Sequence, residues 1–216
     1  MVDGPCTPRR GGSYSVAAVV LAAGCSRRMG GDNKLLLEFG RKPILVHVVE
    51  AVSACGVDEV IVVTGHEADR VRDVLAVCNV RFVHNRRFAD GLSTSLGAGI
   101  GAVSDGAGGA LVCLGDMPLI TVPLLARLTE AFGSWHGQRI CVPTHQGRRG
   151  NPVLWPRALF QEILHLNGDR GARDLLLRRP ELVHQVEVQS TGIFVDIDTR
   201  EDLYRIVQQD NAPKRV

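Results

Sequence analysis

The stretch VAAVVLAAGCSRRMGGDNKLLLE, from Val16 to Glu38, decides the fold of this chain. It begins with an unbroken run of small and β-branched apolar residues, Val16 to Ala23, which is typical of a strand buried on both faces of a parallel sheet. The next eight residues, Gly24 to Gly31, contain three glycines and two arginines. The sequence therefore predicts a buried strand with a glycine-rich loop at its carboxyl end.

This loop has the composition of an anion-binding site. Open α/β sheets bind ligands at the carboxyl ends of their parallel strands. Glycines let a ligand approach backbone N–H groups, which can hold phosphate oxygens, and Arg28 and Lys34 add positive charge suited to a polyphosphate. The spacing is neither Walker A nor GxGxxG, so neither mechanism is implied. The alternative, an ordinary loop with solvated basic residues, does not explain so many cations in a tight glycine-rich turn.

The spaced pattern L-A-A-G-x-S-x-R-M-G-x(3)-K, from Leu21 to Lys34, resembles the signature of the MobA-like nucleotidyltransferases. The resemblance extends over residues 16–207. It implies an α/β, three-layer, Rossmann-like GT-A fold, with a mostly parallel central sheet and helices on both faces. It also implies an enzyme that joins a nucleoside triphosphate to a phosphorylated acceptor, with Arg28, Lys34 and Asp116 as its catalytic residues.

Length and charge limit the possible organisation and partners. The 216 residues are enough for one α/β domain with a full apolar core. We expect a single domain at 15–208, with a nucleotide-binding half at 15–143 and an acceptor-side part at 144–198. The segments 1–14 and 209–216 are expected to be tails. A net charge of +2 gives no reason to expect nucleic acid or a membrane as a partner.

The cysteines indicate a reducing compartment. The six cysteines are scattered, with no metal-ligand spacing, and several lie in apolar runs. Arg9 and Arg10, with the apolar run that leads to Cys25, are similar to an export signal, but cleavage there would split the glycine-rich motif. We therefore expect a cytoplasmic enzyme.

Strand and helix patterns alternate along the first half of the chain, which predicts parallel strands joined by helical crossovers. A short extended piece is expected at 35–39, and a helix begins near Thr199, which can act as its N-cap. Further strands are expected at 60–64, 80–83, 110–114, 140–143, 183–188 and 193–197. Helices are expected at 43–55, 65–75, 92–103, 123–132, 156–164, 171–177 and 199–207.

Three acids are candidate metal ligands. Asp116 follows a buried strand in the sequence G-D-M-P, at the ligand-binding edge of the sheet. A lone acid there could be a turn or cap residue, but the motif matches the metal-binding motif of the family, which implies that Asp116 holds Mg²⁺ against the α-phosphate. Asp196 and Asp198 would share one face of a strand. The resemblance places a metal-proximal residue in their segment. We favour Asp198 slightly over Asp196, although one of the two could simply be the residue before the helix cap.

The resemblance also implies which residues contact the substrates. Nucleotide contacts are expected from Leu21, Ala22, Ala23, Gly24, Ser26, Arg28, Lys34, Ser93 and Ser95, although Ser93 could instead be an N-cap. The guanylyltransferase branch usually has glycine where this chain has Ala23, so the chain looks like the cytidylyltransferase branch, which uses CTP and molybdopterin. Acceptor contacts are expected from Arg149, Asn151 and Arg173; solvated loop charges are the alternative.

The implied reaction needs no strong general base. A terminal phosphate oxygen of the acceptor attacks the α-phosphorus of the nucleotide, and pyrophosphate leaves. Three alternatives remain open: GTP as the donor, a sugar or polyol phosphate as the acceptor, or a non-catalytic carrier of molybdopterin. A molybdoenzyme or its accessory protein is a further partner that the resemblance allows.

Overall fold

The computed structural model describes residues 14–26, 32–168 and 172–210. The expected tail residues 1–13 and 211–216 therefore lie outside the described residues. So does Arg28, whose expected catalytic and nucleotide-binding roles stay predictions.

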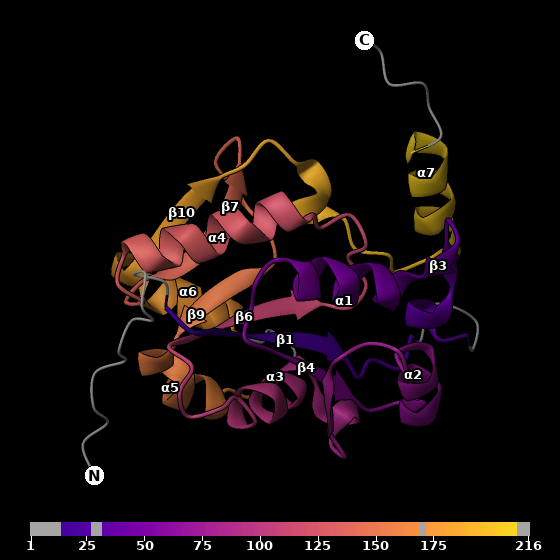
Figure 1. The fold of residues 1–216 in the computed structure, drawn as a ribbon, viewed down its shortest axis with the longest axis horizontal. Coiled ribbons are helices and arrows are strands. Elements are labelled where there is room, and N and C mark those ends of the chain that lie inside the picture. Colours follow the sequence, from indigo (N-terminus) through magenta and orange to yellow (C-terminus); the bar gives the residue numbers. More distant parts are fainter. Residues whose placement is uncertain (1–13, 27–31, 169–171, 211–216) are drawn as a thin grey trace.

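A single eight-stranded sheet forms the centre of the molecule, in the order β10-β7-β9-β6-β1-β4-β5, with β8 paired to β7 (Figure 1). Strand β1 pairs in parallel with both β4 and β6, and β4 pairs in parallel with β5. Strand β9 is antiparallel to β6 and β7. The expected mostly parallel sheet is therefore confirmed. The strands are β1 (Val16–Ala22), β4 (Glu59–Thr64), β5 (Arg81–His84), β6 (Gly109–Leu114), β7 (Ile140–His145), β8 (Arg148–Arg149), β9 (Val153–Pro156) and β10 (Val183–Glu187).

Helices cover both faces of the sheet because β1 is apolar on both sides. Ala18 and Val20 belong to one core cluster, and Ala17 and Val19 to the other. Helices α1 and α4 pack on the first face, and α3 and α5 lie on the opposite side (Figure 1). The helices are α1 (Ile44–Ala54), α2 (Ala68–Val74), α3 (Leu92–Gly101), α4 (Val122–Ser134), α5 (Phe160–Leu164), α6 (Arg173–Arg178) and α7 (Arg200–Asp210). The three-layer arrangement is confirmed.

Short strands and 3₁₀ helices connect the longer elements. Strands β2 (Glu38–Phe39) and β3 (Lys42–Pro43) form a separate two-stranded sheet. The 3₁₀ helices are η1 (Lys34–Leu36), η2 (Phe88–Asp90), η3 (Arg157–Leu159), η4 (Pro180–Leu182) and η5 (Thr191–Phe194). None of the helices in the described residues is long and apolar enough to cross a bilayer.

Small residues let α3 lie unusually close to the sheet. A Cβ atom added at Gly99 would come within 2.3 Å of Val19 Cγ1 and 3.0 Å of Val63 Cγ2. Any side chain there would have to push the helix away from β1 and β4. Helix α3 begins at Leu92, so this close packing also fixes the start of the helix, which forms one wall of the pocket described below.

The strand expected at Ile193–Ile197 is wrong. Ser190 Oγ accepts a hydrogen bond from Gly192 N (3.1 Å), which starts the 3₁₀ helix η5 in place of extended chain. The alternating pattern has another origin, because Ile193 and Ile197 fill two different core clusters. The piece expected to be extended at 35–39 also begins as a 3₁₀ turn, since Asn33 Oδ1 accepts from Leu35 N (3.1 Å).

The last helix is capped as expected but continues to Asp210, beyond the expected end at Val207. Thr199 N donates to Asp202 Oδ2 (2.9 Å), and Asp202 N donates to Thr199 Oγ1 (3.2 Å). This reciprocal pair is a capping box in which aspartate replaces the usual glutamate or glutamine, three residues after the cap. Ile206 packs with Phe39, Ile44 and Ile197, so α7 lies beside the β2–β3 hairpin (Figure 1).

Candidate active site

A pocket of about 320 Å³ opens at the carboxyl ends of β1 and β6. These two strands are neighbours in the sheet, so the loops that follow them meet at one edge. Of the residues expected to bind nucleotide or metal, the pocket lining contains Leu21, Ala23, Gly24, Lys34, Ser95 and Asp116. The remaining lining residues are Cys25, Leu35, Phe88, Ala89, Gly91, Leu92 and Leu114.

The loop after β1 is held in place at both of its described ends. Ser26 adopts a left-handed conformation (φ 47°), and its Oγ accepts a hydrogen bond from Lys34 N (3.0 Å). Ala23 O accepts from His66 N (3.3 Å), and Gly65 lies so close that a Cβ atom there would be 2.8 Å from Ala23 Cβ. In this structure Ser26 therefore fixes the position of Lys34, and the Gly65–His66 backbone supports Ala23.

Two residues expected to contact nucleotide, Ala22 and Ser93, are buried and are absent from the pocket lining. Ser93 is also not the N-cap of α3, because the helix begins one residue earlier and Gly91, with φ 111°, occupies the cap position. Thr94 Oγ1, not Ser93 Oγ, donates to Gly91 O (2.9 Å). The Ser93 hydroxyl is buried and has no hydrogen-bond partner among the described residues.

Asn85 organises the opposite wall of the pocket. Its side chain donates to Thr94 Oγ1 (2.9 Å) and Ser95 Oγ (3.0 Å), and its Oδ1 accepts from Arg87 N (2.9 Å). Asn85 is 6% exposed, so these bonds are shielded from water. They fix the loop that carries Phe88, an apolar lining residue that the sequence interpretation missed. The signal was present, because an aromatic residue in an otherwise polar loop is a candidate contact for a base.

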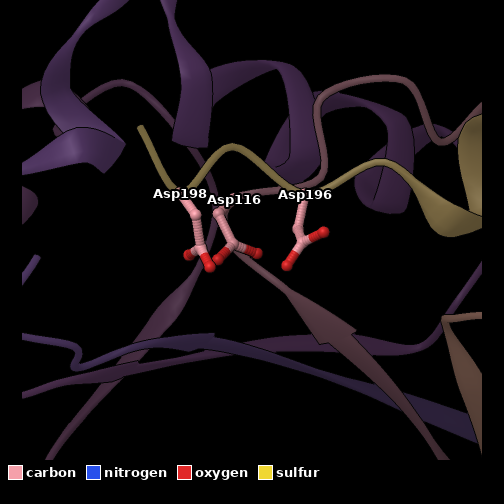
Figure 2. A group of neighbouring side chains, drawn as sticks. All are labelled: Asp116, Asp196 and Asp198. Carbon is pink, nitrogen blue, oxygen red and sulfur yellow. The ribbon is translucent and has the colours of Figure 1, made fainter. Parts of the chain in front are cut away.

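The three candidate metal ligands meet at one point. Asp116, Asp196 and Asp198 each offer a carboxylate oxygen, and these oxygens lie within 4.8 Å of one another. Figure 2 shows the Asp116 side chain between the other two, with all three carboxylates on the same side of the chain. The expected convergence thus occurs without the expected strand. A hydrogen bond from Ile197 N to Asp116 O (3.0 Å) holds the two segments together.

Lys34 binds two of these acids. Its Nζ lies 2.6 Å from Asp116 Oδ2 and 2.8 Å from Asp198 Oδ1. Burial favours the neutral amine, but the two carboxylates outweigh burial and raise the pKa of Lys34. The pKa of Asp116 is raised, mainly by burial. The nearby charge of Asp196 raises this pKa further, while Lys34 lowers it. One ammonium therefore faces three carboxylates in a partly buried site.

The chemistry of this cluster fits a hard divalent cation. Asp116 Oδ1 is buried and has no hydrogen-bond partner among the described residues. A buried carboxylate oxygen without a donor is costly, and a cation would satisfy it. Mg²⁺ and similar ions take carboxylate and phosphate oxygens as ligands. Asp116, Asp196 and Asp198 are the residues that could hold such an ion.

The residues expected to bind the acceptor are not brought together in the same way. Asn151 N donates to Ile193 O (3.0 Å), which places this residue against the segment that leads to Asp196. Arg149 and Arg173 are exposed, and neither lines the pocket. Arg148, which the sequence interpretation did not single out, lies over the ring of Phe194, 4.3 Å from its centroid. Such cation–π contacts leave no sequence pattern by which they could have been found.

A family model of the MobA-like NTP transferase domain matches residues 18–185. The chain belongs to this family. It is 27% identical over 190 residues to the molybdenum cofactor cytidylyltransferase of Escherichia coli. The alignment covers 87% of this chain and 93% of the relative. It is 29% identical over 203 residues to the nicotine blue oxidoreductase of Paenarthrobacter nicotinovorans, covering 89% of this chain and 96% of the relative.

One solved structure is similar to this MobA-like NTP transferase in both sequence and fold. It is Rv0371c of Mycobacterium tuberculosis in complex with manganese, with a TM-score of 0.78 and 26% identity, covering 90% of this chain and 99% of that chain. The resemblance to MobA-like enzymes drawn from the Leu21–Lys34 pattern is confirmed by the match to the family model. The chain is a nucleotidyltransferase by family, with its acid cluster at the carboxyl edge of the sheet.

Proposed function

We propose that this nucleotidyltransferase transfers CMP from CTP to the terminal phosphate of molybdopterin and releases pyrophosphate. The observation that carries the proposal is that Lys34 and Asp116 line a pocket at the ends of β1 and β6, with carboxylate oxygens of Asp116, Asp196 and Asp198 within 4.8 Å of one another. Transfer of a nucleotidyl group depends mainly on positioning and on charge neutralisation, and these residues supply both.

Each part of the site has a role in this proposal. The Leu21–Gly24 backbone and Ser95 contact the nucleoside, while the loop with Ser26 and Arg28 contacts the triphosphate. Asp116, Asp198 and Asp196 hold Mg²⁺, which supplies positive charge to the α-phosphate and to the leaving pyrophosphate when it is bound. Lys34 donates hydrogen bonds to the phosphate oxygens. The manganese complex of Rv0371c supports a divalent ion in a relative, and Mg²⁺ is our choice for this chain.

Two observations favour CTP and molybdopterin. Ala23 stands where guanylyltransferase relatives usually have glycine, and a cytidylyltransferase acting in molybdenum cofactor synthesis is similar over most of the chain. The similarity to an oxidoreductase is of the same size, so family membership alone does not select the reaction. The three acids with Lys34 support nucleotidyl transfer, because charge neutralisation at a polyphosphate needs such groups.

The partners and location form part of the same proposal. Asn151 and the cations Arg149 and Arg173 would contact the phosphorylated pterin, and a molybdoenzyme or its accessory protein would receive the product. The five cysteines in the described residues are all free, which suits the proposed cytoplasmic location. Cell fractionation would test the location.

The test is pyrophosphate release from CTP, GTP, ATP and UTP in the presence of molybdopterin and Mg²⁺, with mass spectrometry of the product. We expect CTP to be preferred by at least about tenfold and Asp116→Asn to lose activity at least about 100-fold, because the amide cannot replace an anionic ligand. Preference for GTP would instead identify a guanylyltransferase. Product formed only with a sugar or polyol phosphate would change the acceptor, and pterin binding without pyrophosphate release would indicate a carrier.

A further inference from the structure

We propose that Lys34 couples the binding of the divalent cation to the binding of the nucleotide, by serving as the counter-ion of the metal ligands until the nucleotide phosphates accept its ammonium. This inference rests on the proposed nucleotide and metal sites, but not on the choice of CTP or of molybdopterin.

The Lys34 ammonium and the divalent cation would bind the same acids. Lys34 Nζ contacts Asp116 at 2.6 Å and Asp198 at 2.8 Å, and these are two of the three clustered acids. Only 14% of the Lys34 side chain and 17% of the Asp116 side chain are exposed, so little solvent screens them. A divalent cation on these carboxylates would lie a few ångströms from the ammonium, and two cations that close repel each other strongly in a partly buried site.

The Lys34 side chain can leave the acids without disturbing the loop. Its backbone is fixed, because Lys34 N donates to Ser26 Oγ (3.0 Å) and η1 begins at Lys34. The ammonium is carried by a flexible four-carbon stem. Only the side chain has to turn, from the acids toward the Gly24–Cys25 end of the pocket, which Lys34 and Asp116 both line.

The nucleotide would supply the replacement partner of the Lys34 ammonium. Phosphates bound at the Gly24–Cys25 end of the pocket would accept hydrogen bonds from the displaced ammonium. The cation would then bind the carboxylates, and Lys34 would bind the phosphates. Without phosphates, displacement leaves an ammonium in a half-buried site with no anion, which opposes metal binding. By linkage, each ligand then strengthens the binding of the other.

The measurement is Mn²⁺ affinity, followed by the electron paramagnetic resonance signal of free Mn²⁺, with and without CTP and with no acceptor present. Without nucleotide, Lys34→Met should bind Mn²⁺ at least tenfold more tightly than the wild type, because methionine keeps the apolar stem and removes the competing charge. The factor by which CTP tightens Mn²⁺ binding should be smaller in Lys34→Met than in the wild type.

Matched variants separate coupling from other effects. Lys34→Arg keeps the charge and should keep the wild-type Mn²⁺ affinity. Lys42→Met removes a lysine that pairs with Glu50 on the surface and should also leave it unchanged. Thermal unfolding of each variant confirms that it is folded. Equal or weaker Mn²⁺ binding by folded Lys34→Met would overturn the proposal. Because no turnover is measured and the nucleotide-free Mn²⁺ affinity does not involve CTP, a different donor or acceptor would refute the proposed reaction and leave the nucleotide-free result standing.

Discussion

Replacing Gly150 by alanine should displace the segment that carries Asp196 and Asp198, two of the proposed metal ligands. A Cβ atom at this position would lie 2.5 Å from Ile193 O and 2.7 Å from Ile193 Cβ, closer than real Cβ atoms approach such groups. The neighbouring residue, Asn151, donates to that same carbonyl (3.0 Å). Alanine must therefore push the two backbones apart at the point where the acceptor-side loop meets the chain leading to Asp196.

The expected loss of stability follows from these contacts. Overpacking of this kind costs about 1–3 kcal/mol, and loss of the Asn151–Ile193 hydrogen bond adds about 0.5–1.5 kcal/mol. We expect a total of about 2–4 kcal/mol in urea unfolding. The effect on turnover should be larger than the effect on nucleotide binding, because misplacing catalytic groups by about 1 Å can slow a reaction about 100-fold.

Gly133→Ala is the matched control. The same methyl group meets open space there, within helix α4, and should stabilise the protein by about 0.5–1 kcal/mol. Urea unfolding, Mn²⁺ affinity and pyrophosphate release would be measured for both variants. If Gly150→Ala unfolds like the wild type and keeps its Mn²⁺ affinity, the contact with Ile193 does not position the carboxylates and the reasoning is refuted.

Two further variants test the nucleotide wall and the last helix. Asn85→Ala should raise KM for the nucleotide more than it lowers kcat and cost about 1–3 kcal/mol of stability, because it leaves Ser95 Oγ and neighbouring polar groups without their partner; steady-state kinetics showing an unchanged KM would contradict this. Asp202→Ala should cost about 1 kcal/mol at pH 7, because it removes the carboxylate that pairs with the Thr199 cap of α7. Hydrogen bonds from Thr199 lower the pKa of Asp202 below its unfolded value near 3.8, so its contribution is present above that pH and is lost as the pH falls through the folded pKa. The difference between wild type and variant in urea unfolding should therefore shrink on going from pH 7 to pH 3, and a constant difference would argue against the carboxylate's role.

The parts of the structure that depend on local pattern were predictable. The run Val16–Ala23 is apolar at every position because β1 is covered on both faces, and this feature is visible in the sequence. Asp116 could be placed for the same reason, since an acid directly after a buried strand falls at the ligand-binding edge of a parallel sheet.

The parts that depend on distant contacts were not predictable. Lys34 lies 82 positions from Asp116 and 164 positions from Asp198 in the sequence, and no local periodicity reveals these ion pairs. The segment Ile193–Ile197 alternates as a strand would, but its two isoleucines fill separate core clusters, so the tertiary structure overrides the local pattern. Asp196 and Asp198 were placed near Asp116 correctly, but for a reason that the structure does not support.

The central claim is that the tip of β1 binds the triphosphate while the acid at the tip of β6 holds the divalent ion beside it. The most direct measurement is an anomalous difference map from crystals soaked with Mn²⁺ and CTP. The account predicts a manganese peak within bonding distance of Asp116 and of a nucleotide phosphate, with the nucleoside between the Leu21–Gly24 backbone and Ser95. A manganese peak away from Asp116, or a triphosphate bound outside this pocket, would contradict it.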